Sequence, residues 1–170
     1  MIISHHKRFV IFAPWKCASS TLHLRLGTFD ESPYPRFHYF NPFLNRVVHQ
    51  HLTCAEFQAL PEARLDYRRA AFVRNPYERV VSGFRQLRRD AALQPQAEFP
   101  EPRVRTIVMQ QLEHNRAQLA RANYGLNAWV RLLNEDQVLA VGKNSSFPLH
   151  PAHYWTHIAR SRYVDFIGRV

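Results

Sequence analysis

Two segments of the chain pass from an apolar, strand-like run directly into a helical pattern, which strongly restricts the folds available to it. In the first, the apolar residues 9–12 end at Pro14, and a turn of small and hydroxyl residues around Lys16 precedes a helical pattern. Free backbone N–H groups at a helix start, together with the positive end of the helix dipole, bind anions. This turn is therefore predicted to hold an anion.

The second segment specifies its helix start almost residue by residue. The apolar residues 70–73 lead into Arg74, and Asn75, Pro76 and Glu78 then supply an N-cap, a proline at the first helical position and a capping-box acid. Arg74 stands at the start of this helix, with Ser82 two turns inside it. The fork of N–H donors on arginine suits phosphate, so this turn too is predicted to bind an anion.

The hydrophobic pattern predicts strands alternating with helices. Further strands are expected at residues 47–52, 138–141 and 163–167, and helices over residues 76–89, 103–121 and 126–134, with an irregular covering segment at 29–45. This alternation predicts an α/β fold in three layers, a parallel sheet flanked by helices on both faces. Both anion-binding turns then lie at the carboxyl edge of that sheet.

The composition and net charge of the chain indicate the kinds of molecule it can bind, but they do not identify one of them. The chain has 170 residues, 46% of them apolar, which suits one ordinary domain with a real core. Its 23 Lys and Arg against 13 Asp and Glu give a net charge of +10, which favours nucleic acid, an acidic glycan or a phosphorylated cofactor. No secretory signal or membrane-spanning run is expected, and Cys17 and Cys54 are too few for a disulfide scaffold.

One pair of histidines is distinguished by its spacing. His49 and His51 alternate in a segment expected to be extended, which places both imidazoles on one face. Histidine suits proton transfer because its pKa lies near neutrality. A metal pair would need a third ligand that no spacing identifies, and a purely structural role is the remaining alternative.

Together these motifs resemble those of sulfotransferases that use 3′-phosphoadenosine 5′-phosphosulfate (PAPS), particularly the carbohydrate sulfotransferases. In that family a strand, a lysine-containing turn and a helix hold the 5′-phosphosulfate, and an arginine at a helix start with a serine farther along holds the 3′-phosphate. The resemblance implies a cofactor-binding set of Lys16, Cys17, Ala18, Ser19, Ser20, Thr21, Arg74 and Ser82. Residues 164–169 are similar to the family's late strand, so the implied P-loop-like sulfotransferase fold spans nearly the whole chain.

The resemblance also implies catalytic roles. The His-x-His segment is similar to that of glycan 2-O-sulfotransferases, which makes His51 the general base and His49 an auxiliary base or an acceptor contact. Lys16 would neutralise the charge that develops on the phosphate oxygen as the S–O bond breaks. No metal is required by these parts.

The expected whole is a single sulfotransferase domain over residues 1–170. It acts on a carbohydrate or glycoconjugate acceptor, binds no specific nucleic acid, and is cytoplasmic and bacterial. Relatives continue past the late strand with a segment that contacts the nucleotide, and we expect this chain to lack it.

Two other functions stay open at this point. A P-loop kinase is disfavoured because the chain has neither a strict G-x-x-x-x-G-K-[ST] motif nor a carboxylate placed for Mg²⁺. A non-catalytic basic protein that binds RNA or acidic polysaccharide is the alternative of a different class.

Overall fold

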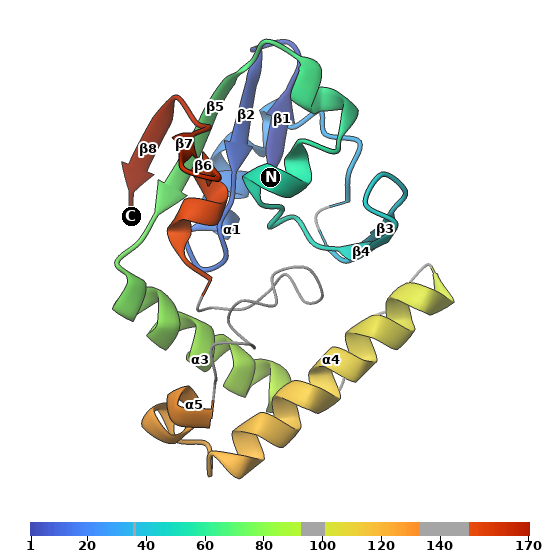
Figure 1. Ribbon diagram of the computed structural model, residues 1–170. Coiled ribbons are helices and arrows are strands. Elements are labelled where there is room, and N and C mark those ends of the chain that lie inside the picture. Colours follow the sequence, from blue (N-terminus) through green and yellow to red (C-terminus); the bar gives the residue numbers. More distant parts are fainter. Residues whose placement is uncertain (36, 93–100, 133–149) are drawn as a thin grey trace.

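A four-stranded sheet organises the chain in the computed structural model, which describes residues 1–35, 37–92, 101–132 and 150–170 (Figure 1). The strand order is β1 (Ile2–Ser4), β2 (Phe9–Phe12), β5 (Arg68–Val73) and β8 (Phe166–Arg169). Strands β2, β5 and β8 run parallel, whereas β1 pairs with β2 in the antiparallel sense. The structure thus confirms the α/β class and the parallel sheet.

The two faces of the sheet bury alternate residues of the same strands. Ile3, Val10 and Phe12 join one core, while Ile2 and Ile11 join another. This division follows from the two-residue period of a strand, which sends successive side chains to opposite faces. Each face therefore has its own apolar cover.

The elements that cover the two faces differ in length, and the expected three-layer arrangement is not confirmed in detail. Helix α1 (Ser19–Leu26) packs Leu22 against one face. The other face is covered by short elements, chiefly α2 (Cys54–Phe57) and the 3₁₀ turn Ala152–Trp155. Shorter pieces complete this part of the chain: the 3₁₀ turns Gly27–Phe29 and Pro61–Arg64, and the hairpin of β6 (His157–Ile158) and β7 (Ser161–Arg162).

Three helices extend away from the sheet and pack on one another (Figure 1). They are α3 (Pro76–Ala92), α4 (Pro102–Arg121) and α5 (Leu126–Leu132). Their shared core contains Phe84, Leu119 and Trp129. These helices are close to the predicted ones, whereas the strand expected at residues 138–141 lies outside the described residues.

A small two-stranded sheet lies between two segments, residues 37–38 and 49–51, that line the cavity described below. Strands β3 (Tyr39–Asn41) and β4 (Arg46–Val48) pair as a hairpin. β3 lies in the segment predicted to be irregular, whereas β4 overlaps the strand predicted at residues 47–52 and ends at Val48. An ion pair between Arg46 and Glu56 ties this hairpin to α2. Within the described parts of the chain, no helix is both long and apolar enough to cross a membrane.

Candidate active site

The first anion-binding turn leaves β2 at its carboxyl end and enters α1. Lys16 and Ala18 have positive φ values of 62° and 60°, a conformation that costs a non-glycine residue on the order of 1–2 kcal/mol. Ala18 is the N-cap of α1 and supplies no side-chain cap. A turn held in this shape, followed by an uncapped first helical turn, presents backbone N–H groups to an anion.

The second turn leaves β5 and enters α3, and Asn75 caps the helix as predicted, whereas the Glu78 carboxylate pairs with Arg74. The Asn75 Oδ1 atom accepts hydrogen bonds from the backbone N–H groups of Tyr77 at 3.0 Å and Glu78 at 3.4 Å. Arg74 donates its Nε to the Glu78 carboxylate at 3.1 Å. Because β2 and β5 are parallel neighbours, both turns lie at the same edge of the sheet.

The side chain of Cys17 points from the first turn into the protein interior, where its thiol meets residues of the second turn and of α3. Cys17 is fully buried, and its burial raises the pKa of the thiol, an effect opposed by the charge of Arg79 and by a hydrogen bond from the Arg74 backbone. Arg79 is also buried, and it donates to the carbonyl oxygen of His150. The buried side chain of Cys17 therefore anchors the first turn to the protein interior, and it does not line the cavity described next.

Both turns open into one cavity of about 520 Å³. Lys16, Ser19 and Ser20 line it from the first turn, and Arg74 and Ser82 line it from the second. Thr21 is exposed and lies outside this lining. The structure thus brings most of the predicted cofactor-binding residues together from two distant segments.

The environment of Lys16 is strongly cationic. Burial lowers the pKa of Lys16, and the positive charges of Arg89 and Arg74 lower it further, while Asp90 acts in the opposite direction. Such a cluster favours an anion between its members, because each cation is stabilised by negative charge.

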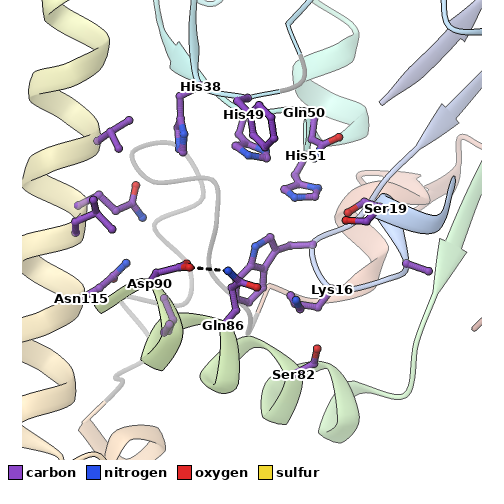
Figure 2. Close-up of a pocket in the computed structure, with 18 of the residues that line it drawn as sticks. Lys16, Ser19, His38, His49, Gln50, His51, Ser82, Gln86, Asp90 and Asn115 are labelled. Carbon is purple, nitrogen blue, oxygen red and sulfur yellow. Dashed lines mark hydrogen bonds between the residues drawn. The ribbon is translucent and has the colours of Figure 1, made fainter. Parts of the chain in front are cut away.

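His51 lies in the middle of the cavity wall, between Lys16 and His38 (Figure 2). Its Nδ1 is 2.5 Å from the carbonyl oxygen of Ala13. A carbonyl oxygen only accepts, so Nδ1 carries the proton and Nε2 keeps its lone pair. Burial lowers the pKa of His51 to about 3, and the positive charges of the N-terminus and Lys16 add to this effect.

A row of three imidazoles lies along this wall. The ring of His49 stacks on that of His51 with centroids 4.6 Å apart, so both predicted histidines lie together. His38, which the sequence analysis missed, lies 4.8 Å from His49, and burial lowers its pKa. Among the described residues, no group of three or more His, Cys, Asp or Glu side chains is placed to hold a metal ion.

The far end of the cavity was not predicted. Helices α3 and α4 line it with five carboxamide or carboxylate side chains, namely Gln86, Asp90, Gln111, Asn115 and the buried Gln118. The Gln86 Nε2 donates to the Asp90 carboxylate at 2.6 Å (Figure 2). These residues read as ordinary exposed helical positions in the sequence, and only the packing of α3 against α4 brings them together.

We expect His51 to stay neutral in the free protein well below pH 6. An unfolded histidine has a pKa near 6.5, whereas burial holds that of His51 at about 3. Between these values the unfolded chain binds a proton that the native chain does not, so stability should fall as the pH is lowered through this window. Nitrogen-15 NMR of the ring should show protonated Nδ1 and bare Nε2 down to pH 5. Thermal unfolding of His51→Asn should depend less on pH than that of the unmutated protein, and an imidazole titrating near 6.5 would contradict the assignment.

Comparison with known proteins supports one family. Neither the curated proteins nor the solved structures gave a significant match. The sequence model of the sulfotransferase family matches residues 1–160, more than nine-tenths of the chain. The chain therefore belongs to the sulfotransferase family.

Proposed function

We propose that the protein transfers a sulfuryl group from PAPS to a hydroxyl group of a carbohydrate. Sulfuryl transfer follows from the family, while the donor and the acceptor are the proposal. One observation carries it: a single cavity holds both anion-binding turns at one end and an oriented, neutral histidine beside them.

The donor end suits a nucleotide with two separate phosphate groups. The first turn offers Lys16, the hydroxyls of Ser19 and Ser20 and backbone N–H groups for the 5′-phosphosulfate. The second turn offers Arg74 and Ser82 for the 3′-phosphate. Since the two groups lie on different strand ends, a ligand that bridges both should bind more tightly than one that reaches only the first.

The middle of the cavity suits an in-line displacement. His51 Nε2 takes the proton from the acceptor hydroxyl while the acceptor oxygen bonds to sulfur. The bond from sulfur to the 5′-phosphate oxygen breaks, and Lys16 with the nearby N–H groups stabilises the negative charge left on that oxygen. His51 gains proton affinity when anionic groups bind at the Lys16 end, because nearby negative charge favours the imidazolium ion.

A nucleotide with a 3′-phosphate should raise the melting temperature, and the same nucleotide without it should not. A ligand at about 100 times its dissociation constant stabilises the native state by about 2.7 kcal/mol. Thermal melts with adenosine 3′,5′-bisphosphate and with AMP measure this difference. A protein that binds RNA without catalysis has no reason to discriminate between them, and equal shifts would exclude the 3′-phosphate role of Arg74 and Ser82.

Arg74→Ala should abolish the difference between the two nucleotides, because it removes the guanidinium that faces the cavity. Glu78→Gln is the matched control, since it breaks the same surface ion pair and leaves Arg74 in place. If Glu78→Gln lost the discrimination as well, the ion pair rather than phosphate binding would explain the Arg74→Ala result.

A further inference from the structure

We infer that the sugar unit entering this cavity is uncharged, with no carboxylate or sulfate group next to the hydroxyl that receives the sulfuryl group. This inference rests on the proposed function and specifies its acceptor class. The net charge of +10 would by itself suggest an acidic glycan, so the local chemistry of the cavity and the global charge point in opposite directions.

The cationic side chains of the cavity gather at the donor end. Lys16 and Arg74 are the Lys and Arg residues among its described lining, and both belong to the anion-binding turns. The acceptor end, which we define as His38, His49, Gln86, Asp90, Gln111 and Asn115, presents imidazoles, carboxamides and one carboxylate. A uronate or a sulfated sugar would find no cationic partner among these side chains.

His38 and His51 do not add positive charge to the acceptor side of the cavity. Burial lowers the pKa of both His38 and His51, so these rings are neutral near pH 7. A neutral imidazole can exchange hydrogen bonds with a hydroxyl group, but it cannot compensate the charge of a bound carboxylate.

A hydrogen-bonded chain fixes the polar groups on α3. Arg89 donates to Gln86 Oε1 at 2.8 Å, and Gln86 Nε2 donates to Asp90 Oδ1 at 2.6 Å. Within the described chain, Oδ2 of Asp90 accepts no hydrogen bond, so it can accept one from a sugar hydroxyl. The same carboxylate repels an acidic sugar, which gives the cavity both an attractive and a repulsive element of specificity.

The arginines nearest this end have partners of their own. Arg89 donates to Gln86 Oε1 and lines a second groove, which shares Arg74 and Ser82 with the cavity. Arg116 donates its Nε to the carbonyl oxygen of Ala91, and Arg103 lies over the ring of Phe40 at 3.3 Å. None of these three arginines belongs to the set of side chains that define the acceptor end, and Asp90 is the carboxylate in that set.

An aromatic side chain at the edge of the cavity adds a feature suited to a sugar ring. Phe37 lines the cavity, is 66% exposed and lies 6.1 Å from His49. Its neighbours differ, because Tyr39 is buried in the core and Tyr34 stacks on it. An exposed aromatic face beside carboxamide and carboxylate groups can cover the apolar face of a neutral sugar, while the polar groups bind its hydroxyls.

The test compares matched acceptors in PAPS-dependent transfer. Cellobiose, lactose and N,N′-diacetylchitobiose are each assayed beside the counterpart whose non-reducing unit carries a C6 carboxylate. The best neutral sugar should exceed its acidic counterpart in kcat/KM by about 10-fold or more, the effect expected when a carboxylate lacks a partner and faces Asp90. Better transfer to the acidic member would overturn the inference and leave the proposed transfer standing.

Transfer to none of these sugars, with a phenol sulfated instead, would overturn the carbohydrate acceptor and this inference with it.

Asp90→Asn should reduce the ratio of kcat/KM for the neutral sugar to kcat/KM for its acidic counterpart, because it removes the repelling charge and keeps the shape of the side chain. Glu113→Gln makes the same charge change at an exposed position of α4 outside the cavity lining and should leave the preference unchanged. Equal narrowing in both variants would show that overall charge, and not Asp90, sets the preference.

Discussion

The His51→Asn protein should transfer sulfuryl groups roughly 10²- to 10⁴-fold more slowly than the unmutated protein, the loss expected when a general base is removed. Asparagine retains an N–H donor for the carbonyl oxygen of Ala13, so the wall of the cavity should persist. The backbone carbonyl of residue 51 can still accept its hydrogen bond from the Trp155 indole. What the substitution removes is the lone pair of Nε2.

Two measurements separate loss of the base from loss of the fold. Adenosine 3′,5′-bisphosphate should still raise the melting temperature of His51→Asn, because the phosphate-binding residues lie on other segments. His49→Asn should show a smaller defect in transfer, since His49 stacks on His51, whose ring is the one oriented by the carbonyl oxygen of Ala13. If His49→Asn were inactive and His51→Asn active, the roles would be exchanged, and if both were active the base would lie elsewhere.

Lys16→Gln should lower the rate of transfer by ~100-fold or more while weakening nucleotide binding less. The charge of Lys16 acts most strongly on the oxygen that becomes anionic as the S–O bond breaks, so its loss affects the transition state more than the ground state. Single-turnover assays with saturating PAPS measure the chemical step directly. A rate equal to that of the unmutated protein would show that Lys16 takes no part in the reaction.

Two further variants control for charge and for position. Lys16→Arg retains a cation at the same positive-φ residue and should keep more activity than Lys16→Gln. Lys7→Gln removes the same charge from an exposed turn between β1 and β2 and should transfer normally. A defect in Lys7→Gln comparable with that in Lys16→Gln would indicate a general electrostatic effect rather than a local one.

Local signals in the sequence account for the donor end of the site. Asn75 and Pro76 specify the start of α3, and the apolar residues of β2 and β5 specify two parallel neighbours. Once both strands are assigned, the rule that parallel strands end at one edge places Lys16 and Arg74 together. Each of these steps depends on residues close in sequence or on one general rule of topology.

The acceptor end depends on long-range packing that no local pattern reveals. His38 reaches its place because the pairing of β3 with β4 brings it beside His49, and Asp90 and Asn115 line the same cavity because α3 packs on α4. Strand β1 was also missed, because three residues carry too little periodicity to identify a strand. The final strand begins at Phe166, three residues after the predicted start, and includes Gly168 and Arg169, which its apolar pattern alone did not mark.

The separate core of α3, α4 and α5 has a consequence for how such a site can diversify. In the proposed reaction, Lys16 and His51 are positioned by the sheet, by Ala13 and by Trp155, whose ring also lies 5.8 Å from the guanidinium of Arg79. The part of the proposed acceptor end that lies on α3 and α4 is instead held by contacts around Leu119 and Trp129. Substitutions on the inner side of α4 can therefore alter the choice of acceptor without redesigning the reaction centre, which makes this helix the natural place to begin directed evolution of new sulfation products.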